Sequence, residues 1–183
     1  VAAAVSVDTY VIQALAAVDE LTVQLNALST RLREWHAYFL PELAHALQDN
    51  EAYVRLIATR DQDDLRREFA PAGSMGAVAS HAAYGPVRLF ALQLHELFIL
   101  RASLLVYLEQ TLSRHAPNML ALAGTTIAAR LIASAGSLRR LASLPSSTLQ
   151  LFGAEKALFR HLKTGAKSPK YGHLFAHPLL QAA

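Results

Sequence analysis

Cysteine is absent from this 183-residue chain, and glycine and proline are scarce, with 8 and 7 residues. Without cysteine there is no disulfide, no thiolate metal site and no cysteine nucleophile. Apolar residues make up 53% of the chain, and alanine and leucine dominate them. This composition suits helices better than disorder or a β protein with many turns. We therefore predict an all-α fold with a sizeable core.

A long uninterrupted hydrophobic run is also lacking. The most apolar stretch, Leu89 to Leu112, is interrupted by His95, Glu96 and Arg101. A lipid-spanning helix would avoid so many polar groups at mid-depth, so we expect no membrane span. Residues 1–7 are apolar but carry no basic leader, unlike a secretory signal. These features together predict an intracellular protein.

Acidic residues are scarce in the second part of the chain. Residues 1–110 contain 8 Lys and Arg and 13 Asp and Glu, a net charge of −5. Residues 111–183 contain 9 bases and a single acid, Glu155, a net charge of +8. Such a basic segment attracts polyanions and indicates nucleic-acid binding. The alternative is that these bases only keep the protein in solution.

The first part of the chain has the pattern of a coiled coil. Apolar side chains in residues 7–40 recur at alternating steps of three and four, at Val11, Ala14, Val18, Leu21, Leu25, Leu28, Leu32 and Trp35. This heptad seam favours packing against a partner helix. Pro41 ends the helix, and a second helical piece covers residues 42–59. Residues 87–113 repeat the pattern, with Val87, Phe90, Leu94, Leu97, Leu104 and Leu108 on one face.

Between these helices, residues 60–67 are a dense run of mixed charge, and proline and glycine follow up to Pro86. This pattern predicts an irregular tip near residues 60–86. We therefore predict an antiparallel coiled-coil hairpin over residues 1–113; the alternative is an ordinary helical hairpin inside a globule. In residues 114–183, glycine and proline separate shorter helical periods, which predicts a compact helical domain.

The segment from Gly153 to Lys163 is the most informative. In a helix, Lys156, Arg160 and Lys163 share one face, while Leu158 and Leu162 point elsewhere. Gly153 would let a phosphate approach the start of that helix, where amide hydrogens favour anions.

A loop with further bases follows this helix. It carries Lys167, Lys170 and His173, and the ring of Tyr171 is suited to stacking on a base or sugar. These residues indicate phosphate binding. The alternative is a solvated amphipathic helix with a charged outer face.

Several segments, in order and spacing, resemble the Nop domain family, in particular its archaeal branch that partners fibrillarin. They are Ala116–Met119, Ala129–Ala133, Ala135–Leu138, Leu141–Ala142, Pro145–Thr148, Gly153–Lys163 and Pro169–Gly172. Upstream, Leu32–Trp35, Phe39–Leu43 and Ser74–Ala77 resemble the coiled-coil region of the same family. A spliceosomal processing factor shares this domain.

The resemblance implies a scaffold of box C/D ribonucleoproteins, which guide ribose 2′-O-methylation in rRNA processing. Such a domain grips kink-turn RNA together with a small ribosomal-protein-like subunit already bound to it. The family motif, here Gly153, Ala154, Glu155, Lys156, Ala157, Leu158, Phe159 and Arg160, lies against the RNA stem. Asn118, Arg130 and Gln150 are expected at the composite surface of RNA and protein.

The resemblance also implies a homodimer formed through the coiled coil. Residues 1–183 do not match the family's N-terminal domain, which holds fibrillarin, or its last helical piece, so we expect either an excised fragment or a shortened relative. We therefore expect fibrillarin recruitment only if an N-terminal domain exists. The expected location is cytoplasmic in an archaeon and nucleolar or nuclear in a eukaryote.

Other chemistries find little support. His173 and His177 are four residues apart but lack acids or thiolates nearby, so no metal site is expected. The remaining histidines are scattered, and the serines lack a nucleophile setting. No cofactor and no catalytic residue are predicted. Two rivals stay open: a coiled-coil interaction module without RNA contact, and a small helical enzyme, which would need clustered acids that the basic half lacks.

Overall fold

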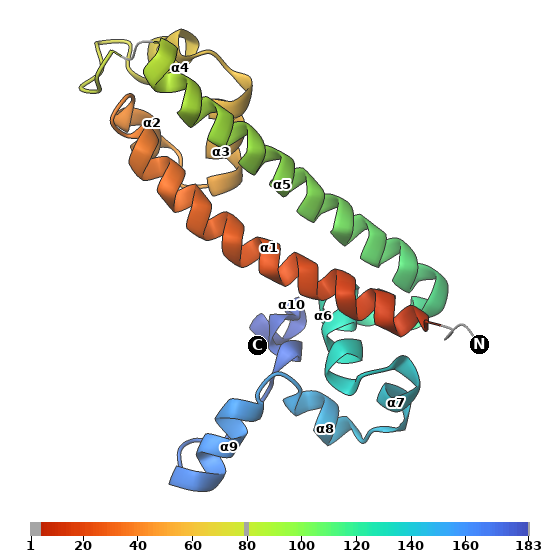
Figure 1. Cartoon of the computed structure of the whole chain (residues 1–183). Coiled ribbons are helices and arrows are strands. Elements are labelled where there is room, and N and C mark those ends of the chain that lie inside the picture. Colours follow the sequence, from red (N-terminus) through yellow and green to blue (C-terminus); the bar gives the residue numbers. More distant parts are fainter. Residues whose placement is uncertain (1–4, 79–80, 183) are drawn as a thin grey trace. The chain divides into compact units, whose positions relative to one another are not determined.

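The computed structural model describes residues 5–78 and 81–182 of the chain. Within these ranges it contains helices and no strand, which confirms the all-α prediction (Figure 1). The helices are α1 (Val7–His36), α2 (Pro41–Ala46), α3 (Asn50–Thr59), α4 (Gln62–Phe69), α5 (His81–His115), α6 (Pro117–Ala135), α7 (Leu138–Ser143), α8 (Ser146–Leu151), α9 (Glu155–Thr164), the 3-10 helix η1 (His173–Ala176) and α10 (Pro178–Gln181).

The chain forms two compact units, and the boundary between them crosses both long helices. The first unit joins Val1–Val18 to Leu104–Ala183, and the second is Asp19–Ser103. Each unit contains a piece of α1 and a piece of α5. The predicted division after residue 113 stays a prediction.

In the second unit, α1 and α5 run in opposite directions and enclose a core to which α2, α3 and α4 contribute (Figure 1). Leu25 and Leu32 of the predicted seam are buried. The seam ends differently from the prediction, because Trp35 is 38% exposed and His36 takes the inward position. The core residues are Leu25, Leu32, Leu40, Leu43, Tyr53, Val54, Ile57, Ala58, Leu65, Val87, Ala91, Leu94 and Phe98.

The prediction of an irregular tip over residues 60–86 is wrong in part. Residues 62–69 form α4, because Leu65 is buried and gives this charged segment an apolar anchor. Helix α5 begins at His81, earlier than predicted, and Pro86 lies inside it. Residues 70–78, between α4 and α5, are irregular, as are residues 60 and 61 before α4.

Polar side chains hold this irregular segment in place. The Glu42 carboxylate accepts hydrogen bonds from the Ser74 hydroxyl and the Met75 amide, both at 2.8 Å. The Met75 amide is the main reason why the pKa of Glu42 is lowered. From α4, the Arg66 guanidinium donates to the Ala77 carbonyl of this segment and, at 2.9 Å, to the Phe39 carbonyl. The segment therefore has a defined backbone path.

A buried histidine connects three helices of the second unit. His36 Nδ1 lies 3.0 Å from the Tyr53 hydroxyl, and Nε2 lies 3.2 Å from the Tyr84 hydroxyl. Both ring nitrogens are satisfied only if one hydroxyl donates and the other accepts. Burial lowers the pKa of His36 from 6.5 to about 4 and raises the pKa of Tyr84 to about 12. The neutral imidazole therefore links α1 to α3 and α5.

In the first unit, α6 supplies the largest share of the core. Its residues Ile127, Ala128, Ala129, Leu131, Ile132 and Ala135 are buried. They pack with Val11, Ala14, Leu15 and Val18 of α1, Leu108 and Leu112 of α5, Ala116, and Leu141 of α7. Gly136 and Gly165 adopt left-handed conformations at the ends of α6 and α9. The prediction that glycines separate the helices of this part of the chain is confirmed at these two positions.

Two helical stretches, residues 82–115 and 117–135, are long and apolar enough by composition to cross a membrane. The first stretch supplies buried residues to both cores, and the second supplies them to the core of the first unit. Helices of protein cores commonly meet the same criterion, so it is weak evidence for a span. The expectation of no membrane span stays a prediction.

We predict that acid destabilises the protein through His36. The pKa of His36 is about 4 in the folded chain, below its ordinary value of 6.5. The stabilising effect of the buried neutral ring is therefore complete above pH 6.5 and is lost as the pH falls toward 4. This loss amounts to about 3 kcal/mol. In urea unfolding at several pH values, His36→Gln should be less stable at neutral pH but less sensitive to acid. His45→Gln, at an exposed site, should keep the original acid sensitivity; an unchanged acid response in His36→Gln would contradict the prediction.

Candidate nucleic-acid interface

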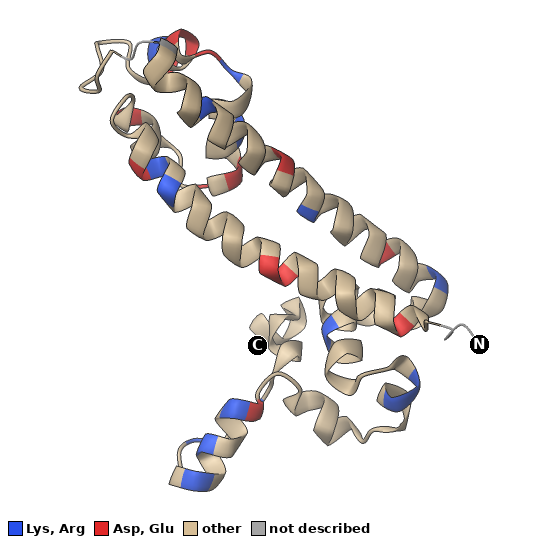
Figure 2. Cartoon of the chain, in the orientation of Figure 1, with Lys and Arg blue, Asp and Glu red and all other residues tan. Residues whose placement is uncertain are grey.

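Helix α9 presents the predicted row of cations. The predicted helix is confirmed over Glu155–Thr164, so Lys156, Arg160 and Lys163 fall on one face. All three side chains are exposed, and none has an ion-pair partner in the described part of the chain. Figure 2 shows these positions in blue along α9, with the acidic position at its start in red. The charges are therefore available to an external anion.

The apolar residues of α9 are exposed as well. Phe159 shares the cationic face and is 65% exposed, and Leu162 is 70% exposed. No residue of α9 is buried. Figure 1 shows α9 projecting from the other helices of its unit. An exposed aromatic ring between basic side chains is suited to stacking on a nucleotide base.

The loop after α9 adds two more cations. Gly165 ends the helix with a φ of +67°, and His161 Nδ1 makes a hydrogen bond with the Ala166 carbonyl. Lys167 and Lys170 are then exposed, with no ion-pair partner among the residues described. The loop therefore extends the basic surface beyond α9.

A clasp of three hydrogen bonds ties the end of this loop to α8. The Gly172 amide donates to the Gln150 carbonyl at 2.9 Å, and the His173 amide donates to the Phe152 carbonyl at 2.6 Å. The Gln150 side chain donates to the Lys170 carbonyl at 2.7 Å. A Cβ atom at Gly172 would lie 1.9 Å from the Phe152 carbonyl oxygen, so only glycine fits there. Gln150, predicted at the composite surface, here supports the loop.

The imidazole of His173 lies behind the start of α9. Gly153 has a φ of +88°, and a Cβ atom there would lie 2.5 Å from the His173 ring. On its other side, His173 Nε2 lies 3.1 Å from the Ser134 hydroxyl of α6. His173 thus supports the loop that precedes α9. Ser134 was not selected from the sequence, since no spacing or motif connects it to a residue 39 positions away.

Glu155 is engaged with the backbone of its own motif. Its carboxylate accepts a hydrogen bond from the Gly153 amide at 2.8 Å. That bond is the main cause that lowers the pKa of Glu155, and the nearby His173 acts in the same direction. The carboxylate therefore stays ionised and fixes the turn before α9. Glu155 therefore stabilises the start of the basic helix α9.

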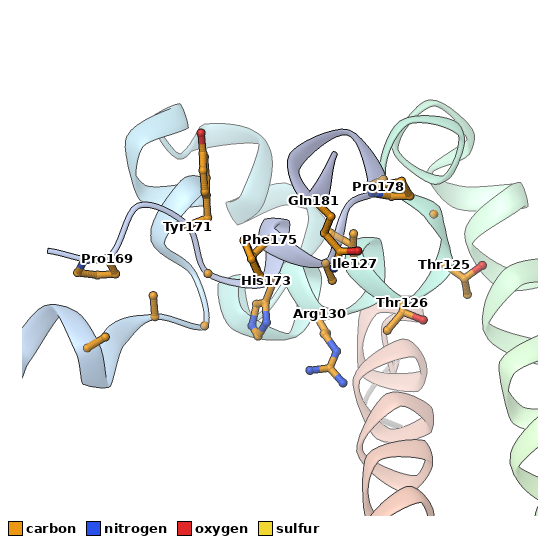
Figure 3. Close-up of a pocket in the computed structure, with 17 residues that line it drawn as sticks. Thr125, Thr126, Ile127, Arg130, Pro169, Tyr171, His173, Phe175, Pro178 and Gln181 are labelled. Carbon is orange, nitrogen blue, oxygen red and sulfur yellow. The ribbon is translucent and has the colours of Figure 1, made fainter. Parts of the chain in front are cut away.

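Five of the predicted residues line one cavity of about 950 Å³. They are Arg130, Gly153, Ala154, Tyr171 and His173. In Figure 3, the Arg130 and His173 side chains extend toward the same side and Tyr171 toward the other. The cavity is also lined by Gly124, whose φ of +73° interrupts α6. Asn118 is exposed at the start of α6 and is not part of the lining.

Fold and site together define a class: an all-helical protein that displays an uncompensated cationic helix and loop. A family model described as the Nop snoRNA binding domain, with fibrillarin in its description, matches residues 17–183. The chain belongs to this Nop family, as the resemblance predicted.

Relatives in archaea and eukaryotes match nearly the whole chain. An uncharacterized NOP5 family protein of Methanocaldococcus jannaschii is 38% identical over 96% of this chain and 46% of the relative. Nucleolar protein 58 of Schizosaccharomyces pombe is 40% identical over 97% of this chain and 38% of the relative. Nucleolar protein 56 of Bos taurus is 39% identical over 92% of this chain and 32% of the relative. The chain therefore spans less than half the length of these relatives.

We predict that Gly153→Ala disturbs the site more than Gly165→Ala does. Both glycines have a positive φ, but a Cβ at Gly153 meets the His173 ring whereas the space around Gly165 is open. Gly165→Ala should therefore cost only the backbone strain, about 1 kcal/mol. Gly153→Ala should cost about 1–3 kcal/mol more. Urea unfolding of both variants measures the difference, and equal losses would show that His173 does not press on Gly153.

Proposed function

We propose that this chain is a non-enzymatic RNA-binding scaffold of a box C/D-type guide ribonucleoprotein. The observation that carries the proposal is the exposed row of Lys156, Arg160 and Lys163 on α9, continued by Lys167 and Lys170, with no ion-pair partner in the ranges that the structure describes. Membership of a family described by snoRNA binding supports it. In this role the chain acts in rRNA processing and supports 2′-O-methylation of RNA.

The mechanism is binding without turnover. The cations of α9 and its loop neutralise phosphates and release condensed counterions, which makes affinity strongly dependent on salt. Phe159 and Tyr171, both exposed, offer rings to bases or sugars. Phosphate contacts carry little sequence information. Specificity therefore comes from the shape of a kink-turn and from the small ribosomal-protein-like subunit bound to it.

The remaining predicted residues have distinct places in this proposal. Asn118 and Arg130 contact the composite surface of RNA and small protein. Gly153, Glu155 and His173 hold the start of α9 in the position that the RNA meets. Gln150 keeps the loop of Lys170 against α8. The RNA-binding domain in this account is residues 114–183, following a coiled-coil region of residues 1–113.

The wider assembly follows from the relatives and is likewise proposed. Fibrillarin is recruited if an N-terminal domain precedes this chain in the full protein. The relatives named nucleolar proteins support a nucleolar or nuclear location in a eukaryote; in an archaeon the location is the cytoplasm. The competing interpretation is a coiled-coil interaction module that makes no RNA contact.

We predict that Lys156→Glu combined with Arg160→Glu abolishes the salt-dependent binding of kink-turn RNA and its small protein. Reversing two phosphate contacts should weaken binding by at least about 100-fold and lower the slope of log affinity against log salt by about two. Both side chains are exposed, so thermal stability should stay unchanged.

Arg31→Glu combined with Arg55→Glu is the matched control. It makes the same change of net charge at exposed positions of the other unit. If both double variants bind equally well, α9 does not hold the RNA, and the interaction-module interpretation is favoured.

Self-association through the coiled coil is supported by a second apolar stripe on α5. In the second unit, Leu89, Leu92, Ile99 and Leu100 are 60%, 38%, 47% and 47% exposed. Leu89, Leu92 and Ile99 follow heptad spacing and Leu100 lies beside them, on the side of α5 away from Leu94, which is buried. An exposed stripe of this kind fits a partner helix, and we propose that a second copy of the chain supplies it.

We predict that Ile99→Asp converts the dimer to a monomer, because it places a charge in the proposed apolar seam. Sedimentation velocity at micromolar concentration measures the change. Gln24→Asp introduces the same charge at an exposed position of α1, off the stripe of α5, and should leave the dimer intact. A wild-type chain that is already monomeric under these conditions would contradict the proposed homodimer.

A further inference from the structure

Helix α7 carries two arginines that the α9 site does not use. Leu141 is buried, and Leu138 packs against the same core. The Ser137 hydroxyl caps the helix by accepting a hydrogen bond from the Arg140 amide at 3.1 Å. With Leu138 and Leu141 held inward, Arg139 and Arg140 are exposed. The core and the cap therefore fix the backbone from which both guanidinium groups project.

Neither arginine is compensated by an acid. Their side chains have no hydrogen-bond or ion-pair partner in residues 5–78 and 81–182. The unit formed by residues 1–18 and 104–183 contains nine bases and only three acids, Asp8, Glu109 and Glu155, a net charge of +6. Glu155 is held by the Gly153 amide. Binding a polyanion would relieve the repulsion among these bases.

The two cationic surfaces of this unit are separate. Residues 141–154, which connect α7 to α9 and include α8, contain no charged side chain. Figure 2 shows the blue segments of α7 and α9 apart from each other, with the tan α8 between them. A ligand that neutralises both surfaces must extend from one to the other.

We propose that Arg139 and Arg140 form a second phosphate-binding surface, which takes a segment of RNA other than the one on α9. This inference rests on the proposed RNA-binding function and extends it. The guanidinium groups present planar forks that match phosphate oxygens, and arginine suits this role better than lysine. Contacts of this kind set the path of the RNA over the domain and do not read its sequence.

The first test is Arg139→Ala combined with Arg140→Ala. Loss of two phosphate contacts should lower the salt slope of kink-turn RNA binding by up to about two and weaken affinity about 10-fold at moderate salt. Arg31→Ala combined with Arg55→Ala removes the same charge from exposed positions of the other unit and should have little effect. An equal, small effect of both pairs would overturn the proposal.

The second test exploits the absence of cysteine from the chain. Ala142→Cys in α7 or Leu162→Cys in α9, both at exposed positions, carries a tethered iron chelate that cleaves nearby RNA. The bound complex of kink-turn RNA and its small protein is the substrate. The proposal predicts cleavage from both positions at different nucleotides. The chain with cysteine at Arg55 is the control and should cleave neither segment.

The outcomes separate the two proposals. Cleavage from α9 alone overturns the second surface and leaves the proposed function standing. Cleavage from α7 alone supports the second surface and contradicts the α9 site. Cleavage from neither position overturns both.

Discussion

Two backbone hydrogen bonds hold the end of the basic loop that follows α9. The Gly172 amide donates to the Gln150 carbonyl at 2.9 Å, and the His173 amide donates to the Phe152 carbonyl at 2.6 Å. Helix α9 buries no side chain, so its place in the unit depends on how its ends are held. At its start, the His173 ring fills the space that a side chain on Gly153 would need. The clasp therefore allows a helix without a core of its own to present its cations in a defined position, which lowers the entropic cost of binding.

The two units differ in net charge and in how many of their bases form ion pairs. Residues 19–103 contain 8 bases and 11 acids, and several bases there form ion pairs, such as Arg101 with Glu51 at 3.0 Å. The unit with α9 has nine bases and three acids. Exposed ion pairs contribute little to stability, but a base that is paired with an acid attracts an external anion less strongly. The bases on α9 and α7, which have no ion-pair partner among the described residues, give this unit a positive field.

The sequence predicted the features that depend on local pattern. The all-α class, the apolar faces of α1 and α5, and the helix of Lys156 and Arg160 all follow from periodicity and composition. Contacts between distant residues could not be predicted this way: Ser134 meets His173 across 39 positions, and His36 meets Tyr84 across 48. Helix α4 was missed because its charges outnumber its one buried residue, Leu65. The arginines of α7 were overlooked because no spacing or family motif singled them out.

We propose that this chain binds a folded RNA only as part of a composite surface. The most direct measurement is an electrophoretic shift with a kink-turn RNA, with and without its small ribosomal-protein-like binder, using chain shown to be folded by circular dichroism. The account predicts a further shifted ternary complex when all three are present, and weak binding when the small protein is omitted. Absence of the ternary complex at micromolar concentrations of the folded chain would contradict it.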